Sequence, residues 1–162
     1  TYIMQFTRAT CLQLNRFYKE NHDKARAKPS DLMFAATDES GQLCAVLRLL
    51  PYSHFLFLRS VFTLPDMRGQ GIAGELIGFA IRTLRSTAQN DRTLGNQPLL
   101  ADNFVNWDIY TLPTPLAQSL YVRLGFEYVD SEDIPSELGA SFRRFKQTNN
   151  RSRIMVLPNR VR

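Results

Sequence analysis

The stretch Leu56–Thr87 decides the fold of this chain, and its first part reads LFLRSVFTLPDMRGQGIAGELI. It opens with a run of apolar, aromatic and β-branched residues that ends at Pro65, which predicts a β-strand. A glycine-rich turn follows. Beyond that turn, apolar residues recur every four positions from Ile72 to Leu84, as on a helix with one buried face. The stretch is therefore predicted to fold as strand, turn and helix.

The glycine-rich turn favours phosphate binding. Few side chains stand where the helix begins, so free backbone N–H groups can approach a ligand, and the helix dipole adds positive potential. Residues Gly69–Gly74 also match G-x-G-x-x-G, the dinucleotide fingerprint. The context argues against that site, because Thr63–Arg68 separates the strand from the first glycine and Asp91 follows a helix instead of ending a strand. A P-loop is excluded because no Gly-Lys-Ser/Thr is present.

Length and composition suit one domain with its own hydrophobic core, since the chain has 162 residues of which 44% are apolar. We expect this domain to span residues 1–158, with a basic tail at 159–162. No apolar run approaches the roughly 20 residues that a bilayer crossing needs, and no export signal is visible, which predicts a cytoplasmic protein without a membrane partner. Cys11 and Cys44 are not spaced as a metal clip and are expected to be packed thiols.

The net charge of +5 comes from the C-terminal twenty residues. Seven of the 20 Lys and Arg residues lie from Arg143 onward, and no Asp or Glu follows Glu137. No pattern of stacking aromatic residues accompanies them, so we expect solvated charge there and no nucleic-acid partner. An acetyltransferase directed at RNA or at an RNA-associated protein stays as a minority alternative.

The rest of the chain alternates between strand and helix patterns. Strands are expected at 2–6, 32–37, 43–50, 55–63, 107–111, 126–130 and 154–157; helices are expected from Thr7 or Thr10 to about Glu20, from 71 to about 88, and from Thr114 and Pro115 to Gly125. Residues 21–31 read as a loop or short helix, 89–106 as a long polar loop, and 131–150 stay open between irregular structure and a helix. The order β-α-β-β-β-α-β-α-β-β predicts an α/β fold with a mixed β-sheet flanked by helices.

A second motif, AQSLYVRLGF at Ala117–Phe126, identifies a family resemblance. Together with Pro65 and RGQGIA at Arg68–Ala73, it resembles the GNAT superfamily of acetyl-CoA-dependent N-acetyltransferases. Members carry Arg/Gln-x-x-Gly-x-Gly/Ala after a strand that ends in x-Pro, and Ala-x-x-Leu-Tyr-x-x-x-Gly-Phe further along the chain. The resemblance covers most of Leu32–Leu157, whereas the first thirty residues and 131–150 carry no signature.

The resemblance implies a GNAT-like fold and an enzyme that transfers an acetyl group from acetyl-CoA directly to a primary amine. Two strands, 55–63 and 107–111, would splay apart to hold the pantetheine arm, and the glycine turn would hold the pyrophosphate. Thr114 stands where the family often has an asparagine, and it can still donate one hydrogen bond. The implied cofactor-binding residues are Val61, Phe62, Thr63, Arg68, Gly69, Gln70, Gly71, Ile72, Ala73, Gly74 and Thr114.

The resemblance also assigns Tyr121 as the general acid that protonates the leaving thiolate, a step that needs no metal. Asp108, on the strand before the tyrosine helix, is the predicted general base, although a one-residue change in register would turn its side chain to the other face. His54 and His22 are the other candidates. If none of these acts as a base, an α-amine or a water-relayed proton would be favoured over direct use of a lysine, because an α-amine with a pKa of roughly 8 is more often neutral near pH 7.

The acceptor is expected to be a small-molecule or protein amine, and a homodimer is left open. The alternative from a different functional class is an acyl-CoA-binding regulatory or partner-binding domain without turnover.

Overall fold

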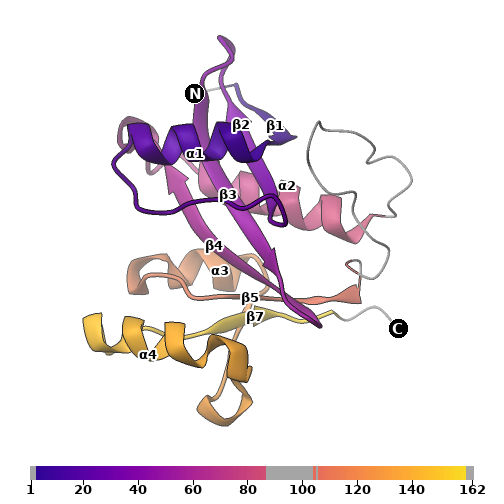
Figure 1. Ribbon diagram of the computed structural model, residues 1–162, viewed down its shortest axis with the longest axis vertical. Helices are drawn as coiled ribbons and strands as arrows, with labels where there is room; N and C mark the ends of the chain where they lie inside the picture. The colour runs from indigo at the N-terminus through magenta and orange to yellow at the C-terminus, as the bar shows by residue number, and fades with distance from the viewer. Residues whose placement is uncertain (1–2, 87–103, 105, 160–162) are drawn as a thin grey trace.

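The computed structural model describes residues 3–86, 104 and 106–159. These residues form a seven-stranded mixed sheet in the order β1-β2-β3-β4-β5-β7-β6, with α1 in front of the strands and α2 behind them in the view of Figure 1. The expected α/β fold with a mixed sheet flanked by helices is confirmed. The strands are β1 (Gln5–Arg8), β2 (Leu32–Thr37), β3 (Leu43–Pro51), β4 (Phe55–Thr63), β5 (Asp108–Thr111), β6 (Glu127–Tyr128) and β7 (Met155–Leu157). The α-helices are α1 (Cys11–Glu20), α2 (Ile72–Arg85), α3 (Gln118–Arg123) and α4 (Gly139–Thr148).

The N-terminal strand lies later in the chain than residues 2–6, so that prediction was wrong in its bounds. Gln5–Arg8 pairs antiparallel with Phe34–Thr37. Helix α1 then begins after Thr10, whose side chain accepts a hydrogen bond from the Gln13 amide while the Gln13 side chain accepts one from the Thr10 amide. This capping box fixes the start of the helix and leaves the preceding residues free to extend the strand.

The two faces of the sheet are covered by different helices. Alternate residues of β2, β3 and β4, among them Phe34, Leu47 and Leu58, pack in one core with α2 and α3. On the opposite face, Met33 and Val46 pack against α1, while Phe55 and Phe57 pack in a separate cluster with the segment that leads into α4. We call these the α2/α3 face and the α1/α4 face.

Strands β4 and β5 run parallel but stay paired over only part of β4. Phe55–Leu58 pairs with Asp108–Thr111, where β5 ends, whereas β4 continues to Thr63. Near the same point β4 bulges: Arg59 faces Arg48 and Phe62 faces Val46, so β4 has one extra residue opposite β3, and Ser60 has a left-handed φ of 59°. The two strands therefore part beyond Leu58.

The bulge is held by side chains from three other segments. The Tyr18 hydroxyl on α1 donates to the Ser60 carbonyl at 2.8 Å, and burial raises the pKa of Tyr18, which keeps the phenol protonated. Arg48 Nε donates to Ser60 Oγ at 3.3 Å, and Arg48 Nη1 forms a buried ion pair with Asp31 Oδ2 at 3.0 Å. The shape of β4 thus depends on α1, β3 and the loop before β2.

The C-terminal third departs most from the predicted elements. The strand expected at 126–130 is reduced to β6, a two-residue edge strand, while residues 131–150, left open from sequence, contain two 3₁₀ turns followed by α4. Thr114 precedes a 3₁₀ turn (Pro115–Ala117) and makes no side-chain capping bond, so α3 starts only at Gln118. Gly125, at which the helix was expected to end, has a left-handed φ of 99° that lets the chain turn after α3. Most of the loop predicted at 89–106, the end of the helix predicted to continue to about 88, and 160–162 of the predicted tail lie outside the described residues.

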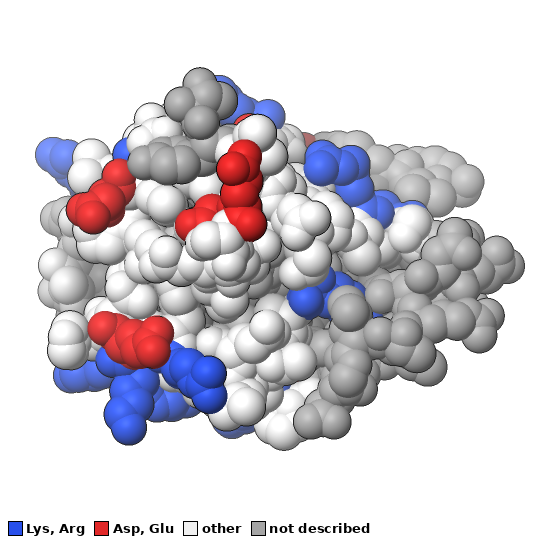
Figure 2. Space-filling model, turned by 90° about the horizontal axis from the view of Figure 1, so that it is seen from above, with Lys and Arg blue, Asp and Glu red and all other residues white. Residues whose placement is uncertain are grey.

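The charged side chains of the described residues form no single patch on the face seen from above. Acidic and basic residues there lie in small separate groups around a broad uncharged area (Figure 2). Among the described C-terminal basic residues, Arg143 and Arg144 are exposed on α4, and Arg153 stacks on the ring of Tyr128 at 4.6 Å. None of the helices in the described part of the chain is both long and apolar enough to cross a bilayer.

The buried ion pair between Arg48 and Asp31 yields a stability prediction. Asp31→Ala leaves the Arg48 guanidinium buried without its carboxylate, which we expect to lower the free energy of unfolding by about 3–5 kcal/mol. Glu39→Ala, at an exposed hairpin position, is the control and should change it by less than about 0.5 kcal/mol. Urea unfolding measures both; equal effects would contradict this account of the bulge.

Candidate active site

A cleft of about 650 Å³ opens where β4 and β5 part. On the α2/α3 face its lining includes Ala73 and Ile77 from α2 and Leu120 and Tyr121 from α3. Its remaining lining residues include Asp23 and Phe145, which come from the loop after α1 and from α4. The cleft therefore passes through the sheet and has one mouth on each face.

The glycine turn lies between two residues that line the cleft, Arg68 and Ala73. Gly69 and Gly71 have left-handed φ angles of 81° and 82°, and an added Cβ at either would meet nothing within 4 Å. Helix α2 has no side-chain cap, and its first backbone bond runs from the Glu75 amide to the Gly71 carbonyl. The amides of Ile72–Gly74 therefore have no acceptor among the described residues and sit at the positive end of a 14-residue helix. This open, side-chain-poor surface fits an anion such as a pyrophosphate.

Arg68 adds a fixed positive charge beside the turn. Its Nε donates to the Thr63 carbonyl at 2.9 Å, and its guanidinium lies over the Phe62 ring at 5.1 Å. Its other guanidinium nitrogens make no hydrogen bond with the described residues. These contacts tie the end of β4 to the turn and leave Arg68 able to bind an anion.

Tyr121 lies at the point where the strands part. Its side chain is only 4% exposed and packs edge-on against Phe126 with ring centroids 5.2 Å apart. Burial raises the pKa of Tyr121 to about 12, and a side-chain hydrogen bond with Thr111, the last residue of β5, opposes part of that rise. Thr111 in turn donates to the Leu58 carbonyl at 3.0 Å, the last paired residue of β4. The Tyr121 phenol is thus held protonated beside the opening.

The structure brings most of the predicted site residues together. Val61, Phe62, Thr63, Arg68, Ala73, Thr114 and Tyr121 all line the cleft. Gly69, Gln70 and Gly71 form the exposed turn between the lining residues Arg68 and Ala73, while Ile72 is buried beneath it. At Gly74 a Cβ would come within 3.1 Å of Leu120, so this glycine lets α2 pack closely on α3.

The structure does not bring Asp108 to the cleft. Asp108 is the first residue of β5 and faces Phe55, at the end of the strand away from Thr111, and its Oδ1 accepts a hydrogen bond from the Asn159 amide at 2.7 Å. His54 is exposed in the turn before β4, next to Ser53, and His22 is exposed in the loop after α1. None of these three side chains lines the cleft.

Two cleft residues, Asp23 and Arg59, received no role from sequence. Asp23 is the one carboxylate among the described lining residues, and its Oδ1 accepts a bond from the Ala25 amide at 2.7 Å. The sequence placed Asp23 in an unsigned loop, and which acid of that loop faces the cleft depends on the left-handed turn at His22. Arg59 lies on β4 beside the bulge, and no motif of the sequence marked it.

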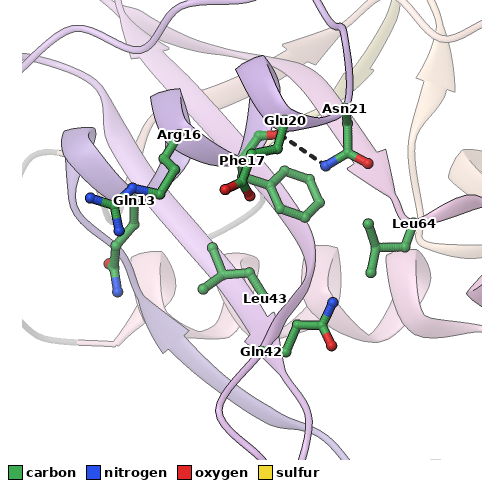
Figure 3. A pocket seen from close by; sticks show the side chains of 8 residues that line it. All are labelled: Gln13, Arg16, Phe17, Glu20, Asn21, Gln42, Leu43 and Leu64. Atoms are coloured by element: carbon green, nitrogen blue, oxygen red, sulfur yellow. Dashed lines mark hydrogen bonds between the residues drawn. The ribbon is translucent and has the colours of Figure 1, made fainter.

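A second hollow, of about 380 Å³, lies between α1 and the ends of β3 and β4 (Figure 3). Phe17, Leu43 and Leu64 give it an apolar floor, and the Asn21 side chain bonds to the Phe17 carbonyl at 2.9 Å. It shares no lining residue with the cleft and contains none of the motif residues. The cleft is therefore the candidate active site.

The burial of Tyr121 predicts a pH dependence of stability. Because the folded chain holds this proton more tightly than the unfolded chain, whose tyrosines ionise near 10, the free energy of unfolding should fall as the pH rises from about 10 to 12. Tyr18 adds to the same loss. By pH 11, half-way through this range, Tyr121→Phe should remove about 1.4 kcal/mol of the loss. Urea unfolding at pH 8, 10 and 11 measures this; an unchanged slope in the variant would contradict it.

The fold is similar to that of solved acetyltransferase structures. The ribosomal-protein-S18-alanine N-acetyltransferase from Escherichia coli has a TM-score of 0.63 at 16% identity, with 99% of this chain and 96% of that chain covered. A GNAT family acetyltransferase from Elizabethkingia anophelis with acetyl-CoA bound has a TM-score of 0.59 at 14% identity, covering 96% and 97%. N-acetylglutamate synthase from Neisseria gonorrhoeae, complexed with coenzyme A and N-acetyl-glutamate, reaches 0.61 at 11% identity, covering 99% and 36%.

At these identities the likeness shows the fold alone. A sequence search of curated proteins finds no significant match. The family model of the acetyltransferase (GNAT) domain, however, matches residues 29–128, more than half of the chain. That range contains β2–β6, the glycine turn and Tyr121. The chain therefore belongs to the GNAT family of acetyltransferases.

Proposed function

We propose that this GNAT enzyme moves an acetyl group from acetyl-CoA directly to a primary amine, with Tyr121 as general acid. Family membership makes the chain an acetyltransferase with acetyl-CoA as its acyl donor. The observation that supports direct transfer is the cleft itself, which has one mouth beside the glycine turn, another on the opposite face of the sheet, and Tyr121 where the strands part.

The donor is expected to enter from the α2/α3 face. The amides of Gly69–Gly74 and the Arg68 guanidinium would hold the pyrophosphate. The backbone of Val61–Thr63 has no pairing with β5, which ends at Thr111, so its free edge is available to the amide groups of the pantetheine arm. Thr114, exposed at the rim, can supply one further hydrogen bond.

At the reacting end the chain supplies hydrogen-bond donors. An amide on the free edge of β4 stabilises the negative charge that develops on the carbonyl oxygen as the amine attacks, a contribution worth roughly 3 kcal/mol in other enzymes. As the carbon–sulfur bond breaks, Tyr121 donates its proton to the sulfur and regains one from the solvent. The raised pKa of Tyr121 keeps the phenol protonated at neutral pH but makes it a weak acid, so its hydrogen bond to the developing thiolate carries much of the effect.

The acceptor amine must lose a proton, and Asp23 is the one carboxylate among the described residues that line the cleft. We assign Asp23, in preference to Asp108, as the group that takes this proton directly or through water. An acceptor with an α-amine, whose pKa is roughly 8, needs less help than a lysine side chain at roughly 10.4.

Tyr121→Phe tests the general acid. We expect kcat to fall roughly 100-fold with little change in the KM for acetyl-CoA, because the hydroxyl acts on the leaving sulfur and the ring still fills its site. Tyr128→Phe, an exposed tyrosine on β6, is the matched control and should keep wild-type kcat. Free-thiol release with a panel of amines measures both. Tight acetyl-CoA binding with no turnover of any amine would instead favour the regulatory domain.

Gly69→Asp tests the pyrophosphate site. A carboxylate at the turn should weaken acetyl-CoA binding at least roughly tenfold by charge repulsion. Gly41→Asp, at a left-handed hairpin glycine with a φ of 88° and open space around it, carries the same backbone strain away from the cleft. Wild type and the Gly41 variant should gain about 2.7 kcal/mol of stability at a ligand concentration of a hundred times Kd. Calorimetric titration with acetyl-CoA measures the affinity of each protein, and equal affinities in the Gly69 and Gly41 variants would place the pyrophosphate elsewhere.

A further inference from the structure

The cleft mouth on the α1/α4 face, where the acceptor is proposed to enter and which we call the acceptor mouth, holds a positive charge without a counter-ion among the described residues. Arg59 lines the cleft from β4 and is half-buried. Its cross-strand neighbour Arg48 is neutralised by Asp31 at 3.0 Å. Arg59 has no carboxylate within ion-pair distance in the described part of the chain, and that includes Asp23 of the same cleft.

The surroundings strengthen this positive potential. Burial lowers the pKa of Arg59, and the charges of Arg48 and of Arg144 on α4 lower it further, although a guanidinium still stays protonated at neutral pH. A partly buried charge gains most from a partner that brings both opposite charge and hydrogen-bond acceptors. A planar anion such as a carboxylate matches the guanidinium fork.

The same mouth offers apolar surface beside the charge. The Arg59 guanidinium lies 5.6 Å from the centre of the Phe57 ring, and Leu112 and Phe145 also line the cleft. Phe145 on α4 is 40% exposed, which is high for a phenylalanine. A ligand here can therefore place carbon atoms against aromatic rings while its anionic group meets Arg59.

We propose that the acceptor is a small amine that carries an anionic oxygen group, with Arg59 binding that group; this inference rests on the proposed function. Arg59 is two residues before Val61 on β4 and lines the same cleft, so the anionic group lies near the attacking nitrogen, as in an amino acid. Polyamines and other purely cationic acceptors are disfavoured by the same charge.

Matched acceptors test the inference with the full chain. L-phenylalanine, its amide and phenethylamine share the apolar group and differ in the carboxylate; O-phosphoethanolamine supplies phosphate in its place, and spermidine is the cationic arm. We expect the carboxylate or the phosphate compound to exceed the amide, phenethylamine and spermidine in kcat/KM by roughly tenfold or more. Whichever of L-phenylalanine and O-phosphoethanolamine has the higher kcat/KM shows whether Arg59 binds a carboxylate or a phosphate. Equal or better use of the amide or spermidine would overturn the proposal.

Arg59→Gln then tests the residue. It should raise the KM for the anionic acceptor roughly tenfold to a hundredfold, abolish the preference over the amide, and leave the stabilisation by acetyl-CoA unchanged; Arg59→Lys should restore part of the preference. Arg123→Gln, exposed on α3, is the control and should behave as wild type.

A preference for the anionic acceptor that survives in Arg59→Gln would overturn the assignment of Arg59. Normal acetyl-CoA binding without turnover of either anionic amine would overturn this inference alone, whereas loss of acetyl-CoA binding in wild type would overturn the proposed function as well.

Discussion

The hydrogen bond from the Tyr18 hydroxyl to the Ser60 carbonyl holds the feature on which the site depends. A left-handed backbone at a serine costs of order 1–3 kcal/mol, and it persists only where the surroundings fix it. Tyr18 and the Arg48–Asp31 pair provide that fixation from α1, β3 and the loop before β2. The bulge divides β4 into one part that pairs with β5 and another whose edge is free. A single strand thereby serves both the core and the cleft.

The two helices on the donor side depend on each other. Gly74 lets α2 approach Leu120 of α3 closely, and α3 carries Tyr121 against Thr111 at the end of β5. The helix whose N-terminus faces the proposed phosphate site is thus packed directly on the helix that carries the proposed acid. Arg68 closes the arrangement by linking the glycine turn to the Thr63 carbonyl. The residues proposed for binding and for chemistry are therefore linked by direct contacts.

Sequence patterns predicted those parts of the molecule that local chemistry determines. The Gly69–Gly74 turn, the helix after it and the left-handed Gly125 follow from glycine content and apolar spacing. The Ala117–Phe126 motif placed Tyr121 in the cleft lining. Patterns could not place Asp108, because the pairing of β5 with β4 decides at which end of the strand it lies relative to the cleft. They could not single out Asp23 either, because its position depends on the path of the loop after α1. The bounds of β1 and β6 were missed because short edge strands carry too few residues for periodicity to mark their ends.

Because the cleft passes through the sheet, its two mouths give each substrate a separate route to the reacting atoms. The donor, entering beside the glycine turn on the α2/α3 face, does not have to leave before the acceptor arrives from the α1/α4 face. For the proposed direct transfer this geometry favours a sequential kinetic mechanism through a ternary complex, and it lets the acceptor mouth change its specificity without altering the donor site.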